Sequence, residues 1–288
     1  DDYPYRERLD DWDGTESLAD TIQTTQSIQA DILRRKIETT RIDPATTPGF
    51  IAGKLAAVWP GISSALIDTL GRPTKGFWTV KQSCEPAILS LRRNDDRFEA
   101  WVVNSAKTPV NGLLMVFDPL APASDRRAAA TVDVPAGSAA LVWSSTPESW
   151  AERAFRDDDL PVLGAFAGEP LTFSKLARAA VPMLTLRDGS PIPSLSPQQE
   201  RSDPRVPPEL QSSLFCRPIA DVSLPEAQLH IITFAEDKGP WRMTVRSFER
   251  KYIRNVRISF DSPDAAWVSD QHFDVLPDAG RLITIQPK

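Results

Sequence analysis

The first periodic segment of the chain predicts an amphipathic helix over residues 17–41. Its apolar side chains recur at roughly helical spacing, with polar residues between them. They are Leu18, Ile22, Ile28, Ile32, Leu33 and Ile37. Ser17 and Asp20 resemble an N-terminal capping box, and Asp43-Pro44 is a stop signal because the residue before a proline disfavours helix. A polar, acidic arm over residues 1–16 is expected to precede the helix.

An apolar run without alternation follows over residues 49–58 (GFIAGKLAAV). Continuous apolar character is typical of a strand buried on both faces, as in a parallel sheet or a barrel. The run ends at residues 59–61 (WPG), and a short helix is expected over 74–83. The buried side of that helix would carry Phe77, Trp78 and Val80. This order indicates an α/β segment, although one strand alone cannot make a sheet.

From Glu85-Pro86 onward the chain consists of short apolar runs separated by Asn, Asp, Pro and Gly. The runs are AILSLRR, RFEAWVVN, GLLMVFD, AAATVDV and AALVW. Their hairpin-like spacing predicts an antiparallel sandwich over about residues 86–145. Residues 146–216 are less regular and include a proline-rich loop or linker, and the sequence LFCRPIADVSLP indicates a closing strand and an exit linker.

A second β-domain is predicted from Gln228 onward. Two apolar sets alternate there with polar residues: Trp241, Met243 and Val245, then Val256, Ile258 and Phe260. Such alternation indicates strands with one dry and one wet face, and LITIQ is the expected last strand. The tryptophans on predicted strands are expected in the cores, their usual place. They are Trp101, Trp143, Trp241 and Trp267.

Composition excludes several partners. The 288 residues carry a net charge of −6, which argues against nucleic acid, because affinity for phosphates comes from Lys and Arg. No apolar run approaches the roughly 20 residues that cross a bilayer, so no membrane partner is expected. The acidic opening lacks the pattern of a signal peptide, which predicts a mature, processed or internal fragment. For Cys84 and Cys216, two buried thiols are favoured over a disulfide.

The residues themselves offer little catalytic chemistry. Acidic stretches at 95–99, 156–159 and 274–278 fall between predicted strands, where charged turns are the norm, and Asp274 is expected to cap a turn. His230 and His272 have no third ligand at metal spacing, so no metal site is predicted. A glycine-rich phosphate loop is also missing from the sequence. No catalytic residue and no cofactor are therefore assigned to this chain.

Three motifs in the same order resemble β-mannosidase-like enzymes of glycoside hydrolase family 2. Residues 49–91 (GFIAGKLAAVWPGISSALIDTLGRPTKGFWTVKQSCEPAILSL) resemble the last barrel strand, the last barrel helix and the first sandwich strand of that family. The stretch RFEAWVVNSAKTPVNGLLMVFD is similar to the sandwich that follows the barrel. Residues 267–285 (WVSDQHFDVLPDAGRLITI) resemble the C-terminal immunoglobulin-like domain. Residues 1–16 and 146–212 lack a clear match.

The resemblance implies a mainly β chain with an α/β segment. Residues 1–84 would be the end of a (β/α)8 barrel, containing its last βα unit. Residues 85–222 would be a β-sandwich with a proline-rich insertion, and residues 223–288 an immunoglobulin-like β-sandwich. In this family the two catalytic carboxylates lie on earlier barrel strands, so both would belong to a larger N-terminal chain that acts as partner. The chain is then expected to be stable only against the rest of the barrel.

Lys54 and Trp59 are the candidate substrate-binding residues. Barrel enzymes place their active site at the C-terminal ends of the strands, and the expected strand over 49–58 ends beside these two residues. Trp59 would lie against a sugar ring or plug the barrel core, and Lys54 would donate to a hydroxyl or carboxylate, or extend into solvent. The usual family pattern, Trp-Gln-Leu-Asn-Asp, is replaced here by residues 53–57 (GKLAA).

Three functions follow as hypotheses. The first is the C-terminal chain of a retaining glycosidase that hydrolyses β-linked glycosides, with β-mannosides as the leading substrates. The second is a catalytically degenerate carbohydrate-binding or scaffold subunit of the same ancestry, which the missing aromatic and Asn-Asp positions favour. The third, an adhesion module, requires exposed aromatic patches on the sandwiches and ranks last.

Overall fold

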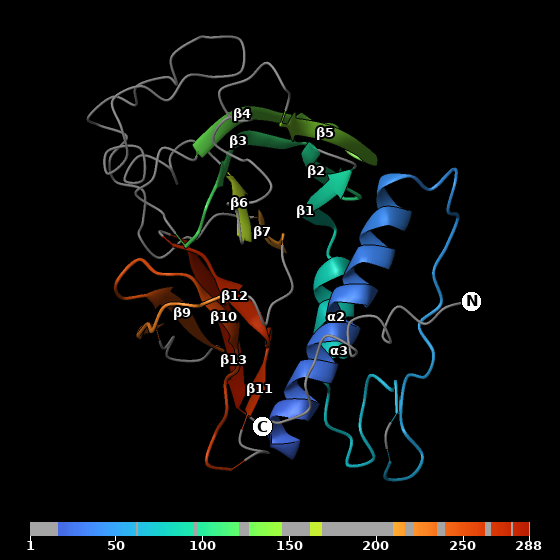
Figure 1. The fold of residues 1–288 in the computed structure, drawn as a ribbon, viewed down its shortest axis with the longest axis vertical. Helices are drawn as coiled ribbons and strands as arrows, with labels where there is room; N and C mark the ends of the chain where they lie inside the picture. Colours follow the sequence, from blue (N-terminus) through green and yellow to red (C-terminus); the bar gives the residue numbers. More distant parts are fainter. Residues whose placement is uncertain are drawn as a thin grey trace. The chain divides into compact units, whose positions relative to one another are not determined.

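A computed structural model of the chain describes residues 17–61, 63–94, 97–120, 127–145, 162–168, 210–216, 222–234, 240–262, 266–277 and 279–287. The chain divides into two compact units, Asp1–Pro86 and Ala87–Lys288. Among the described residues, the helices belong to the first unit and the strands to the second (Figure 1). None of the described helices is both long enough and apolar enough to cross a membrane.

The first unit contains two packed helices, α2 (Leu18–Ile42) and α3 (Lys75–Ser83). Ser17 caps α2 by accepting the N–H of Asp20 at 3.4 Å, which confirms the predicted start. Gly76 lets the helices approach, since a Cβ there would lie 3.2 Å from Leu33 Cδ1. Trp78 of α3 is buried as predicted, whereas Phe77 and Val80 are only partly buried.

The predicted buried strand over residues 49–58 is wrong. Only isolated bridges form here, Ala56 with Ile67 and Ile67 with Pro73. Ile51 is 93% exposed and Val58 is 83% exposed. A strand forms when neighbouring strands satisfy its backbone N–H and C=O groups, and the described part of this unit provides no sheet for it. The apolar run therefore stays on the surface.

The second unit begins with a sandwich of two antiparallel sheets, ordered β1-β2-β5 and β4-β3-β6-β7. The strands are β1 (Ala87–Asn94), β2 (Arg97–Asn104), β3 (Val110–Phe117), β4 (Arg127–Val134), β5 (Ser138–Ser144), β6 (Val162–Gly168) and β7 (Leu210–Phe215). The five runs predicted in this region all form strands, β1 to β5. The strand β6 was not predicted. The predicted closing strand is confirmed as β7, which begins four residues before the sequence LFCRPI.

The remaining strands form a four-stranded sheet, ordered β11-β13-β9-β8, and a two-stranded sheet of β10 and β12. They are β8 (Leu229–Phe234), β9 (Trp241–Ser247), β10 (Ile253–Val256), β11 (Ala266–Val268), β12 (Phe273–Val275) and β13 (Gly280–Pro287). We call this part the C-terminal sandwich. The expected last strand, LITIQ, lies inside β13 and is confirmed.

The middle sheet β4-β3-β6-β7 is buried on both faces. Its Leu114 and Val116 pack into the core of the first sandwich, together with Leu91, Phe98 and Trp143. Its other face carries Leu113, Met115 and Phe117, which pack against Tyr252, Leu276 and Ala279 of the C-terminal sandwich. The two sandwiches therefore share one sheet as a packing layer.

Two tryptophans predicted in the core are instead exposed. Trp143 is 4% exposed, as expected, but Trp241 is 51% exposed and Trp267 is 49% exposed. Trp267 pairs with Gln286 on the wet face because its neighbour Val268 takes the core position. Trp241 lies on the same face of β9 as the buried Met243 and Val245. It is the first residue of that strand, however, and the described residues do not cover its side chain. Trp101 is partly buried.

The two cysteines are free thiols, as favoured from the sequence. The accompanying prediction that both are buried is wrong for Cys84, which is exposed, and Cys216 is partly buried. Cys84 follows directly after the last residue of α3, where the end of the helix leaves its side chain at the surface.

Candidate functional site

The candidate residues Lys54 and Trp59 lie on one exposed segment of the first unit. Three backbone hydrogen bonds join this segment to Leu66 and Ile67 of the same unit. The carbonyl of Lys54 accepts the N–H of Leu66 at 3.1 Å, and the carbonyl of Leu55 accepts the N–H of Ile67 at 2.9 Å. The N–H of Ala57 donates to the carbonyl of Ile67 at 2.9 Å. These bonds fix the backbone on the N-terminal side of Trp59.

A turn centred on Asp68 holds the opposing segment in place. Asp68 Oδ1 accepts the N–H groups of Leu70 at 2.8 Å and Arg72 at 2.9 Å, and Oδ2 accepts Arg72 Nε at 2.7 Å. Burial alone would raise the pKa of Asp68, but the hydrogen bonds from Arg72 and Leu70 outweigh it and lower the pKa. Gly71 has a φ of 75°, a conformation that glycine adopts without strain.

Both candidate side chains reach solvent. Trp59 is 71% exposed and Lys54 is exposed, so neither is a core residue of the first unit. Other large apolar side chains near them in sequence are also exposed, namely Ile51, Leu55, Val58 and Leu70. A flat indole and an ammonium donor on one segment suit the face and the hydroxyls of a sugar. The apolar surroundings suit a packed protein surface as well.

The acidic stretches supply no pair of free carboxylates among the described residues. Residues 95, 96, 156–159 and 278 lie outside the described part of the chain. Glu99 is buried and accepts Trp101 Nε1 at 2.8 Å and Asn94 Nδ2 at 3.1 Å. Asp274 accepts three hydrogen bonds inside the second unit, so it does more than cap a turn. Both described carboxylates are thus structural.

The histidines are likewise engaged in local contacts. The ring of His230 stands edge-on to Phe248, with centroids 6.1 Å apart. Nδ1 of His272 lies 2.9 Å from Asn255 Oδ1. In the described ranges, no group of three or more His, Cys, Asp or Glu side chains could hold a metal ion.

Sequence reasoning missed the exposed apolar surface around Lys54 and Trp59, because it predicts residues 49–58 as a strand buried on both faces. The signal was nevertheless present. A continuous apolar run with no second strand in the neighbouring sequence must find its sheet partners elsewhere or remain exposed.

The chain has the fold of a part of several glycosidases of known structure. The β-D-mannosidase from Dictyoglomus thermophilum matches with a TM-score of 0.68 at 14% identity, over 98% of this chain and 29% of that one. The exo-chitosanase CsxA from Amycolatopsis orientalis matches with a TM-score of 0.61 at 13% identity, over 98% of this chain and 33% of that one.

An exo-β-D-glucosaminidase CsxA structure gives a TM-score of 0.60 at 13% identity, also over 98% of this chain and 33% of that one. By sequence, no protein-family profile and no curated protein matches. This chain thus spans about a third of the length of these enzymes, and at such low identity the likeness establishes the fold. The shared fold extends over both units, from the helices to the last strand.

Proposed function

We propose that this chain is the C-terminal portion of a retaining glycoside hydrolase that acts on β-linked glycosides, with β-mannosides as the first substrates to test. The observation that carries the proposal is the likeness over 98% of the chain to a β-D-mannosidase, in line with the three sequence motifs. On this view residues 1–84 complete a (β/α)8 barrel, residues 85–222 and 223–288 are its sandwiches, and the catalytic carboxylates belong to a larger N-terminal portion.

The exposed apolar side chains of residues 49–59 support the proposal that a partner covers this segment. Ile51, Val58 and Trp59 are 93%, 83% and 71% exposed. Burying such side chains contributes about 1.5–3 kcal/mol each, so a surface that gathers several of them gains most from a covering partner. Strands of a barrel would supply both the apolar cover and the hydrogen-bond partners for residues 49–58. The proposed partner is therefore the rest of the barrel.

The proposed roles follow from the exposed chemistry. Trp59 would present its ring to one face of the sugar, and Lys54 would donate hydrogen bonds to a hydroxyl or carboxylate. The reaction would need two carboxyl groups about 5 Å apart, one as nucleophile and one as acid/base, which the partner portion would provide. No metal and no organic cofactor takes part in this proposal.

The test is an assay of the enzyme as it occurs, with any co-purifying chain identified by native mass spectrometry. Trp59→Ala should lower kcat/KM for a nitrophenyl β-mannoside by about 10²-fold, because misplacement of a substrate costs that much. Trp267→Ala is the matched control, since Trp267 is 49% exposed but lies in the C-terminal sandwich. Lys54→Met should act in the same direction, whereas Lys107→Met should leave the rate unchanged.

A second candidate is a catalytically degenerate carbohydrate-binding or scaffold subunit. The replacement of the usual aromatic and Asn-Asp positions by residues 53–57 (GKLAA) favours it. The exposure of Trp241 and Trp267 is instead what the adhesion module requires. The assay separates the two functions. A partner chain without hydrolysis of β-mannosides, β-glucosaminides or β-glucosides, but with retention on a carbohydrate column, would replace the enzyme proposal by this one.

A further inference from the structure

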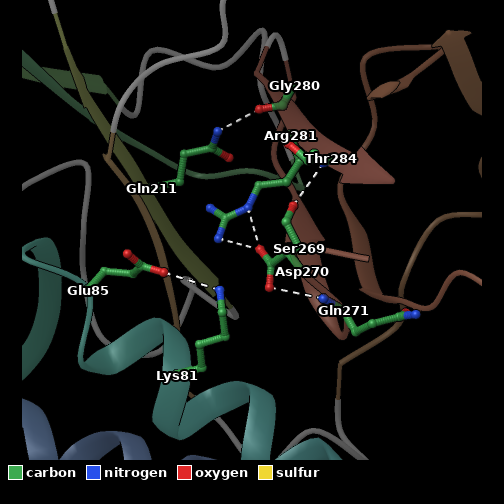
Figure 2. A network of polar contacts seen from close by, with 9 residues as sticks. All are labelled: Lys81, Glu85, Gln211, Ser269, Asp270, Gln271, Gly280, Arg281 and Thr284. Atoms are coloured by element: carbon green, nitrogen blue, oxygen red, sulfur yellow. Dashed lines mark hydrogen bonds and ion pairs between the residues drawn. The ribbon is translucent and has the colours of Figure 1, made fainter. Parts of the chain in front are cut away.

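One side of the edge strand β7 faces the C-terminal sandwich. Its alternate residues Gln211, Ser213 and Phe215 contact that sandwich, while Leu210 and Leu214 point into the first core. Gln211 Nε2 donates to the carbonyl of Gly280 at 2.6 Å, which Figure 2 shows beside the Asp270–Arg281 ion pair. The period of two along a strand explains how one strand serves both partners.

Asp274 of β12 collects the polar contacts at this junction. Its Oδ2 accepts the hydroxyl of Ser213 at 2.6 Å and the hydroxyl of Tyr252 at 2.6 Å. Its Oδ1 accepts the N–H of Asn255 at 2.9 Å. The guanidinium of Arg254 lies over the ring of Phe215, with its Cζ 4.3 Å from the centroid. One carboxylate thus links β7 of the first sandwich to the β10 segment of the C-terminal sandwich.

Close packing surrounds this polar centre. Tyr252 is 1% exposed, and its ring lies 6.2 Å from that of Phe215. Gly164 of β6 permits the approach, since a Cβ there would be 3.2 Å from Leu276 Cδ2. A charged group held in such an environment needs its partners, because an unpaired charge away from water is costly.

We propose that Asp274 is an acid-sensitive latch, whose ionised carboxylate holds the C-terminal sandwich docked on β7 and whose protonation releases it. A protonated Asp274 carries no charge to balance Arg254, and the hydrogen bonds that it accepts from the hydroxyls of Ser213 and Tyr252 are no longer charge-assisted. The strongest hydrogen bonds of the junction are thereby weakened. This inference goes beyond the proposed function and does not depend on it.

The sign of the pH dependence follows from the local charges. Burial alone would raise the pKa of Asp274, but the positive charge of Arg254 and the hydrogen bonds from Ser213, Tyr252 and Asn255 outweigh it and lower the pKa. The docking stability from Asp274 is therefore present above the unfolded pKa of about 4 and is lost as the pH falls through the lower folded value. Release belongs to the window below about pH 4.

The titratable neighbours of Asp274 favour its ionised, docked state. Burial and the charge of Asp274 raise the pKa of Tyr252 well above its usual value, so its hydroxyl remains a donor. Arg254 is the described cation that faces Asp274 from β10, and β7 contributes the neutral Ser213 and Phe215. Nδ1 of His272 lies 2.9 Å from Oδ1 of Asn255, so this histidine is included among the control variants.

The test uses the full chain, with its partner where one co-purifies. Asp274→Asn should lower Tm at pH 7 by about 10 °C, because it removes a carboxylate that accepts three hydrogen bonds in a unit of this size. The difference from the wild type should shrink as the pH falls below about 4, and it should vanish once the wild-type carboxyl is protonated. Small-angle scattering should show the variant expanded already at pH 7, and the wild type expanded only below about pH 4.

Two control variants separate docking from other effects. Asp270→Asn removes a carboxylate that pairs with Arg281 within the C-terminal sandwich, at 2.7 Å, so it should leave the pH 7 scattering profile compact. His272→Asn should leave the acid transition unchanged. If Asp274→Asn does not fold, Ser213→Ala retains the carboxylate and should cost about 3 °C, again only above about pH 4.

Either of two results would overturn the latch. One is a compact Asp274→Asn variant at pH 7, or a wild type that stays compact throughout the acid titration. The other is a Tm deficit in Asp274→Asn or in Ser213→Ala that does not shrink as the pH falls. The latch is supported by a deficit that disappears on acidification, together with expansion of the wild type only at low pH and of the Asp274→Asn variant already at pH 7.

Discussion

Asn104→Asp is expected to reduce the free energy of unfolding of the second unit by about 4 kcal/mol or more. Asn104 is 1% exposed, and its Nδ2 donates to the carbonyl oxygens of Thr108 at 2.9 Å, Val134 at 3.1 Å and Pro135 at 3.1 Å. Its Oδ1 accepts the N–H of Ala106 at 3.0 Å. An aspartate has no N–H to donate, so a carboxylate oxygen would face three carbonyl oxygens at the end of β2.

The measurement is urea unfolding at pH 7, monitored by tryptophan fluorescence, to which the buried Trp143 contributes. Asn104→Ala removes the same hydrogen bonds without adding charge, and should cost about 2 kcal/mol. Gln286→Glu makes the same amide-to-acid change at an exposed position of β13 and should change stability by less than about 0.5 kcal/mol. Equal losses for the aspartate and alanine variants at Asn104 would contradict the predicted repulsion.

The segments that sequence predicted well are those whose structure is decided locally. The helix at Ser17 carries its own cap and periodicity, and the runs that became β1 to β4 form two hairpins of neighbouring strands. The prediction that Lys54 and Trp59 share one segment is also local, because the two residues are close together in the sequence. The spacing of apolar residues predicts which side chains of a segment are buried together, and short connections bring neighbouring strands into contact.

The sequence-based predictions fail where the pairing partner of a segment is distant in the sequence or missing from the described residues. The strand β6 pairs with β3 and β7, which are far from it in sequence, and four of its seven residues are Gly or Ala, which carry little strand signal. The run over 49–58 has strong apolar character but no sheet to join in the described part of its unit, so it is exposed. The junction of Ser213 with Asp274 joins residues 61 positions apart, which no local pattern could reveal.

Leu114→Ala is expected to cost about 4 kcal/mol, near the upper part of the range for a buried leucine, and to lower Tm by about 10 °C. Leu114 is 0% exposed in the middle of β3. The residues paired with it on both neighbouring strands are small, Ala130 on β4 and Ala167 on β6. The leucine therefore fills space that its neighbours leave open, and their short side chains cannot move in to close the cavity.

Leu141→Ala is the matched control, because Leu141 lies on β5 of the same sandwich but is 42% exposed. It should cost less than about 1 kcal/mol, since a large part of this side chain stays in water in the folded state. The cavity argument also predicts a rescue. Adding Ala130→Leu to Leu114→Ala should recover part of the loss, because the new side chain projects from the adjacent strand into the same space. Similar losses for the two leucine variants in thermal unfolding, or a double variant less stable than Leu114→Ala, would show that the alanine-flanked centre of β3 is not the volume that the core depends on.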